Sequence, residues 1–193
     1  VSNMPSNPRR DATTVAGNEK VLRARLSDAR FFWDQDLKLK LQDRVPALSK
    51  INFFDRLGSV EDKSERLQNL VPSICEYTDV DNVEGAVKAA KLAKADLSTM
   101  MVNEFPDLQG IMGGYYASAD GEATEVCRAI AGHYAPAGPT DDCPSEPITI
   151  IVSIADKIDS LVGFFGINEK PTGSKDPFAL RRAALGIIRI IIE

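Results

Sequence analysis

The sequence predicts an all-α protein, a multi-helix bundle, and three observations indicate this fold class. Apolar residues recur at the 3.6-residue period of an amphipathic helix along most of the 193 residues. Residues that cap helix N-termini precede these stretches, and prolines or glycines follow them. No segment shows the sustained alternation of a half-buried strand. The one expected departure is a short irregular or strand-like segment at the N-terminus.

The composition narrows the class of protein. Hydrophobic residues make up 44% of the chain, and the net charge of -5 argues against a broad nucleic-acid-binding surface. Cys75, Cys127 and Cys143 are odd in number and widely separated, so neither a disulfide framework nor a zinc site is indicated. No apolar run approaches the roughly 20 residues that cross a bilayer, and no export signal is visible. We therefore expect a soluble, cytoplasmic protein with no membrane or DNA partner.

The N-terminal part is expected to be a connector followed by helices. Residues 1–16 contain prolines and little apolar periodicity, so we separate them from a helical domain over 17–193. A helical stripe that begins at Asn18 predicts a long helix to about Arg44, and Pro46 marks its end because proline disfavours helix in the residue before it. A short helix is expected over 47–57.

Capping residues organise the middle of the chain. Ser59 and Asp62 form the S-x-x-D arrangement of a capping box, which predicts a helix to about Tyr77. Asp81 with Glu84 repeats this signal and predicts a helix to about residue 105. Shorter helices are expected over 107–117 and 121–134, and a proline-rich surface loop over 135–147. Three glycines in the first of these indicate close approach of a neighbour: Gly110, Gly113 and Gly114.

Two apolar helices are expected at the C-terminal end, joined by a turn-rich connector over 166–175. Asp176 can cap the second helix, and Pro177 suits its first position. We expect the apolar stripe of each helix to be buried. The first stripe comprises Ile151, Ile154, Ile158, Leu161, Val162 and Phe165, and the second comprises Leu180, Ala184, Ile187, Ile188 and Ile191.

Basic residues beside the second helix are candidates for binding phosphate. Arg181 and Arg182 fall outside its apolar stripe, and Lys170 and Lys175 precede them. Helix-end amides together with cationic side chains can bind a phosphate. The alternative is that these side chains keep the helix soluble or pair with carboxylates such as Asp156. A second candidate patch holds Arg23, Arg25 and Arg30, but Asp28, Asp34 and Asp36 dilute it.

Acidic residues and the single histidine offer little catalytic chemistry. Asp156 and Asp159 lie three residues apart on one helix, so they could hold a cation or act as an acid and base, but a solvated helix edge is the favoured interpretation. His133 is interpreted as a helix-end residue that bonds a terminal carbonyl. No phosphate-binding glycine loop and no nucleophile–base pair is visible. The sequence therefore predicts no catalytic centre and no metal site.

Four blocks of sequence carry a resemblance to a known family. They are GNEKVLRARLSDARFF, LGSVEDKSERL, EFPDLQGIMGGYY and ADKIDSLVGFFGI followed, after a short gap, by PTGSKDPFALRRAALGIIRI. In this order they resemble the β subunit of the bacterial-type heterotetrameric glycyl-tRNA synthetase, and the chain is similar to an internal fragment of it. The resemblance implies an ATP- and Mg-dependent glycine–tRNA ligase. Its implied partners are the α subunit, which holds the adenylate-forming site, tRNA(Gly), and the remaining β-subunit domains.

The same resemblance implies an HD-like helical domain, a fold named for a metal-binding His-Asp pair. In that comparison the pair falls at Ala95 and Asp96, a first histidine falls near Phe54, and the last carboxylate falls at Asp156. Both histidine positions are empty, so the domain is expected to be a retained scaffold that also contacts tRNA. Two alternatives stay open. One is a divergent HD-type metal-dependent phosphohydrolase, and the other is a scaffold that contacts protein only.

Overall fold

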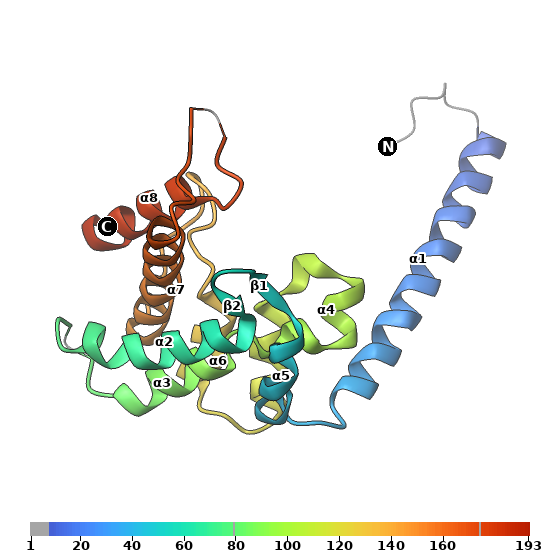
Figure 1. Cartoon of the computed structure of the whole chain (residues 1–193). Helices are drawn as coiled ribbons and strands as arrows, with labels where there is room; N and C mark the ends of the chain where they lie inside the picture. Colours follow the sequence, from blue (N-terminus) through green and yellow to red (C-terminus); the bar gives the residue numbers. More distant parts are fainter. Residues whose placement is uncertain (1–7, 79, 174) are drawn as a thin grey trace.

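The computed structural model describes residues 8–78, 80–173 and 175–193, and helices form almost all of its regular structure (Figure 1). The all-α prediction is confirmed. The α-helices are α1 (Pro8–Asp36), α2 (Val60–Cys75), α3 (Val83–Leu92), α4 (Met100–Glu104), α5 (Ile111–Ala119), α6 (Thr124–Gly132), α7 (Pro147–Gly166) and α8 (Leu180–Ile192). The 3-10 helices are η1 (Leu41–Lys50), η2 (Ala95–Ser98) and η3 (Pro106–Leu108), and strands β1 (Asn52–Phe54) and β2 (Gly58–Ser59) pair antiparallel.

The hydrophobic core lies where α2, α3, α6 and α7 pack together. Leu67 and Val71 of α2, Ala89 of α3, Ile130 of α6 and Ile151 of α7 are fully buried there. Figure 1 shows α2 and α3 side by side, with α8 against α7 at the end of the chain. In the described part of the chain, no helix is long and apolar enough to span a bilayer.

The predicted capping box is confirmed at the start of α2. The Ser59 hydroxyl accepts a hydrogen bond from the amide of Asp62, and the Asp62 carboxylate accepts one from the Ser59 amide at 2.7 Å. The next cap is Asn82 rather than Asp81, because the Asn82 side chain accepts from the Gly85 amide at 2.8 Å. A short polar side chain at the last non-helical residue therefore marks both helix starts.

The long helix predicted over 81–105 is wrong. It divides into α3, η2 and α4, because the chain turns inward after α3 to bury Lys94 and Asp96. Thr99 then starts α4 by accepting a hydrogen bond from the Val102 amide at 3.2 Å. The helices expected over 107–117 and 121–134 are present as α5 and α6, each starting a few residues later.

The N-terminal predictions need three corrections. The helix expected from Asn18 begins at Pro8, so residues 8–16 are helical, whereas residues 1–7, including the expected strand remnant, lie outside the described residues. The long helix ends at Asp36 instead of Arg44, because the Asp36 carboxylate bonds the amides of Met100 and Met101. The short helix expected over 47–57 is replaced by η1 and the β1–β2 hairpin.

The two C-terminal stripes are only partly buried, which contradicts the expectation. On α7, Ile151 is buried, but Val162 and Phe165 are 67% and 47% exposed. The buried residues of α7 include Asp159. The buried face of this helix is therefore rotated about the helix axis relative to the apolar stripe that the sequence predicts. Helix α8 begins at Leu180, not at Pro177, and its Ile188 and Ile191 are exposed.

Candidate functional site: a lysine–aspartate cluster and an arginine surface

Asp156 and Asp159 lie in a buried cluster of charges. The Lys63 ammonium on α2 is 3.1 Å from Asp156 Oδ1 and donates a 2.9 Å hydrogen bond to Asp159 Oδ2. Lys94, between α3 and η2, donates to Asp156 Oδ2 at 3.2 Å. The lysine side chains are only 4% and 5% exposed. The predicted solvated helix edge is therefore wrong; we call these four residues the lysine–aspartate cluster.

Further hydrogen bonds join Asp159 and Lys63 to neighbouring residues. Arg66 Nε donates to Asp159 Oδ1 at 2.6 Å, and its Nη1 reaches the Leu57 carbonyl at 3.0 Å. Lys63 also donates to the Ser160 hydroxyl at 3.0 Å. Since Lys63 and Arg66 both belong to α2, Asp159 ties α7 to α2 by two charged groups. Buried charges paired in this way avoid most of the cost of desolvation.

His133 ends α6 and bonds a terminal carbonyl, as predicted. Its Nδ1 is 2.7 Å from the Ile130 carbonyl oxygen, and its Nε2 is 2.8 Å from the Lys94 ammonium. Because a carbonyl can only accept and an ammonium can only donate, Nδ1 carries the proton and Nε2 accepts from Lys94. Burial, together with the charge of Lys94, lowers the pKa of His133 to about 3. The imidazole is therefore neutral at physiological pH.

The cluster keeps its charges despite burial. Burial by itself raises the pKa of Asp156, but Lys94 and Lys63 hold it well below its usual range. Burial lowers the pKa of Lys94, and Asp156 opposes that change. The Lys94 ammonium also lies 3.8 Å from the centre of the Tyr134 ring, a cation–π contact. The site is thus a set of compensated charges without a free acid or base.

The residues at the HD positions do not assemble a metal site. Asp96 is buried, and its Oδ2 accepts from the amides of Gly110 and Gly113 at 2.6 and 3.0 Å. Burial raises the pKa of Asp96. Ala95 is fully buried, and the ring centroid of Phe54 lies 5.3 Å from that of Phe164. Across residues 8–78, 80–173 and 175–193, no group of three or more His, Cys, Asp or Glu side chains could hold a metal ion.

Arg181 and Arg182 lie exposed in the first turn of α8, and no hydrogen bond or ion pair joins their side chains to the described residues. Asp176 accepts from the amides of Leu180 and Arg181 at 2.8 and 2.9 Å. The predicted cap is therefore confirmed, but it occupies the amides that were expected to bind a phosphate. An anion there would depend chiefly on the arginine side chains. Lys170 and Lys175 are exposed in the preceding connector.

The second arginine patch is not continuous with the first. Arg25 on α1 forms an ion pair with Glu104 and lies 5.6 Å from the centre of the Phe105 ring, so its charge is already compensated. Arg23 is exposed. In Figure 1, α1 stands at the opposite side of the molecule from α8. The structure thus keeps Arg181 and Arg182 on α8 apart from Arg23 and Arg25 on α1.

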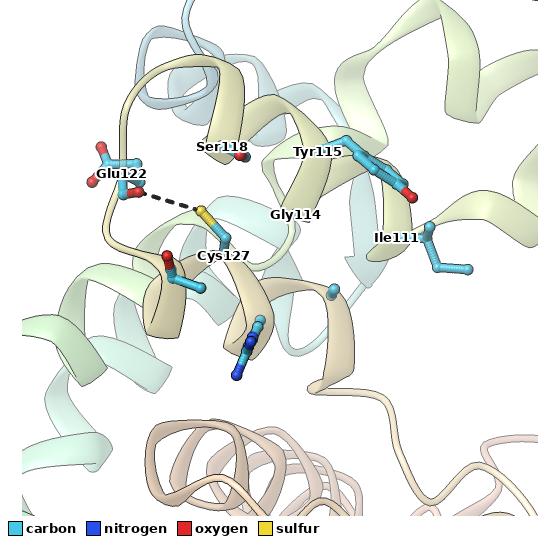
Figure 2. Close-up of a pocket in the computed structure, with 9 residues that line it drawn as sticks. Ile111, Gly114, Tyr115, Ser118, Glu122 and Cys127 are labelled. Atoms are coloured by element: carbon cyan, nitrogen blue, oxygen red, sulfur yellow. Dashed lines mark hydrogen bonds between the residues drawn. The ribbon is translucent and has the colours of Figure 1, made fainter.

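A groove between α5 and α6 has a volume of about 330 Å³ (Figure 2). Tyr115 and Ser118 line it from α5, and Cys127 lines it from α6. The Cys127 thiol donates a 3.6 Å hydrogen bond to the Glu122 carbonyl, and burial raises the pKa of the thiol. The cysteine is thus an unactivated thiol, and the lining offers no nucleophile–base pair.

Sequence reasoning missed the two lysines of the cluster. Helical spacing could have identified Lys63 as buried. This residue follows the buried Val60 by three residues and precedes the buried Leu67 by four, so all three share one helical face. A cation at a core-facing helical position requires a buried anion. Lys94 carries no such signal, since it lies in the irregular turn between α3 and η2.

Comparisons with known proteins agree on one family. The family model described as "Glycyl-tRNA synthetase beta subunit" matches residues 1–193. The glycine–tRNA ligase beta subunit of Phenylobacterium zucineum is 53% identical over 94% of this chain and 28% of its own length. That of Rhodospirillum centenum is 54% identical over 94% of the chain and 26% of its own length, and that of Aromatoleum aromaticum is 52% identical over 100% and 27%. The chain thus spans about a quarter of the length of these relatives.

Proposed function

The chain belongs to the glycyl-tRNA synthetase beta subunit family, and we propose that it is a helical domain of a glycine–tRNA ligase β subunit. In this proposal the domain braces neighbouring β-subunit domains and contacts tRNA(Gly). The assembly with the α subunit charges the tRNA with glycine in the cytoplasm. The α subunit, rather than this domain, binds the ATP and Mg that form the adenylate.

The lysine–aspartate cluster is the observation that supports a bracing role. Its two ammonium groups already lie beside Asp156, so a divalent cation there would meet like charge at close range. The same groups join α2, the turn before η2, and α7 through buried ion pairs. Breaking such a pair leaves an uncompensated charge in the interior and is strongly destabilising. The cluster therefore fixes α2, the turn before η2 and α7 against one another, and its ammonium groups disfavour a bound metal ion.

The exposed pair Arg181 and Arg182 supports the contact with tRNA. A chain with a net charge of -5 needs a local basic patch to bind phosphate. These two side chains belong to consecutive residues, are exposed and are not engaged by the described residues, so each is available for phosphate oxygens. Lys170 and Lys175, in the connector that precedes α8, are exposed as well.

The test is a double variant in the full α/β assembly. We expect Arg181→Ala with Arg182→Ala to weaken tRNA binding roughly tenfold or more, since a hydrogen bond to a charged group contributes about 1.5–3 kcal/mol. Each lost phosphate contact should also reduce the slope of log K against log salt by about 1. Affinity is measured over a series of salt concentrations, alongside aminoacylation.

A matched control removes two positive charges from another part of the surface. Lys50 and Lys91 are exposed on η1 and α3 and have no side-chain partner among the described residues, so Lys50→Ala with Lys91→Ala should leave the affinity unchanged. Arg181→Lys with Arg182→Lys should retain most of the salt slope, because lysine keeps the charge. An alanine variant with the wild-type affinity and salt slope would remove the tRNA role.

A scaffold that contacts only protein is the second candidate, and the apolar surface of α8 favours it. Leu185, Ile188, Ile191 and Ile192 are 50–77% exposed, which is more typical of a protein interface than of an RNA-binding surface. Chemical footprinting of tRNA on assemblies with and without the Arg181 and Arg182 substitutions separates the two functions. Protection that depends on the arginines supports tRNA contact, whereas an identical footprint supports the protein-only scaffold.

A further inference from the structure

Helix α1 carries an apolar stripe that extends beyond the part of the helix packed on the body. Its C-terminal part is docked, since Ala29, Phe32 and Trp33 pack against the core and the Trp33 ring stacks on Tyr116 with centroids 5.1 Å apart. Toward the N-terminus the helix stands away from the other elements (Figure 1). There Val15, Leu22 and Leu26 are 54%, 60% and 62% exposed.

The exposed and the docked residues share one helical face. Val15, Leu22, Leu26 and Trp33 follow one another at intervals of seven, four and seven residues, which keeps them in line along an α-helix. The stripe that packs on the body at Trp33 therefore continues without a change of face to Val15. Spacing of this kind is typical of a helix that packs against another helix.

The chemistry of this face favours protein over RNA. Its exposed groups are aliphatic, and the charged residues along its edge are of both signs, with Glu19 one helical turn before Arg23. Phosphate binding would need clustered cations, whereas an aliphatic stripe is stabilised by removal from water. Solvent exposure of these three side chains is thus unfavourable unless another surface covers them.

We infer that a helix from another part of the same β subunit covers Val15, Leu22 and Leu26. The chain corresponds to only 26–28% of the length of the relatives in Phenylobacterium zucineum and Rhodospirillum centenum, so most of a β subunit is available to supply this helix. Since α1 already packs on the body with the same stripe, a neighbouring helix would extend an existing interface. The inference rests on membership of the β-subunit family and is independent of the proposed tRNA contact.

The experiment places a photo-crosslinking amino acid at residue 22 of the full-length β subunit, alone and assembled with the α subunit and tRNA. We expect a crosslink from position 22 to a β-subunit peptide outside these 193 residues, with the same yield in the presence and absence of tRNA. The matched control places the same group at Lys20, which is exposed on the opposite side of α1. We expect at least a fivefold lower yield from position 20.

Hydrogen exchange gives a second measurement that does not depend on crosslinking. In the full-length β subunit, Leu22→Ser with Leu26→Ser should increase the exchange rate of α1 amides near these residues at least fivefold, while Lys20→Ser should not. Crosslinks from position 22 to the α subunit or to tRNA would overturn the inference. Equal labelling from positions 20 and 22, or unchanged exchange in the double variant, would overturn it as well. Failure of the Arg181 and Arg182 test leaves these outcomes unaffected.

Discussion

At the scale of single residues, the molecule depends on how it compensates buried charge. Lys63, Lys94, Asp156 and Asp159 are individually costly in an interior, and together they form a neutral set. Hydrophobic residues of similar volume often serve stability equally well, so the presence of the set is not in itself stabilising. Removal of one member is destabilising, because a remaining charge stays buried without its partner.

Asp156→Asn should therefore be strongly destabilising. The substitution keeps the shape of the side chain but leaves Lys63 with Asp159 alone and removes the carboxylate that Lys94 contacts. Breaking a buried ion pair costs about 3–5 kcal/mol. Equilibrium urea unfolding measures the change. Asp142→Asn is the control, because Asp142 is exposed in the loop before α7 and should change stability by less than about 0.5 kcal/mol. Equal midpoints for the two variants would contradict a structural role for the cluster.

His133 should make stability depend on pH in a defined direction. Its pKa is about 3 in the folded protein against 6.5 for an unperturbed histidine, so the unfolded state binds a proton that the folded state does not. This contribution to stability is present above pH 6.5 and is lost as the pH falls toward 3, by about 1.4 kcal/mol per pH unit.

His133→Gln isolates that contribution, since it removes the titrating group while its side-chain carbonyl can still accept from Lys94. Urea unfolding of both proteins between about pH 7 and pH 4.5 gives the two profiles. The wild-type protein should lose stability more steeply as the pH falls, and carboxylates common to both proteins cancel in the difference. Parallel profiles would show that the imidazole is protonated in the folded state.

At the scale of elements, close approach of helices explains the glycines of α5. The predicted role of Gly113 and Gly114 is confirmed, since a Cβ atom on Gly113 would lie 2.8 Å from Ile130 Cγ2. One on Gly114 would lie 2.9 Å from the Cys127 carbonyl oxygen, which is backbone and cannot rotate away. Both contacts involve α6, so the glycines set the distance between these two helices.

Gly114→Ala and Gly17→Ala should have opposite effects. The Gly114→Ala substitution pushes α5 away from α6, and overpacking of this kind costs about 1–3 kcal/mol of stability. Gly17 lies inside α1, and a Cβ atom added there would meet no described atom within 4 Å, so alanine should stabilise by about 0.5–1 kcal/mol through helix propensity. Thermal unfolding of the two variants gives the sign of each change. A stabilised Gly114→Ala variant would contradict the tight α5–α6 contact.

At the scale of the whole molecule, the domain is a helical body in which the two acidic residues at the HD positions are already engaged, Asp156 by lysines and Asp96 by backbone amides. The purified protein should therefore contain no stoichiometric divalent metal and should not hydrolyse phosphoesters. Elemental analysis and a melting curve with and without EDTA measure this, and the chelator should leave the midpoint unchanged. Tightly bound metal together with phosphoester cleavage would favour the divergent phosphohydrolase instead.

The sequence by itself determined the all-α class, the caps at Ser59 and Asp176, and the family, because these depend on local patterns or on long matching blocks. Only the tertiary structure decided that Lys63 meets Asp159, and that Val162 and Phe165 remain exposed. The physical reason is that helical periodicity shows which residues share a face but not which face is turned inward. Packing of α2 against α7 made that choice, and it selected the face on which opposite charges could pair.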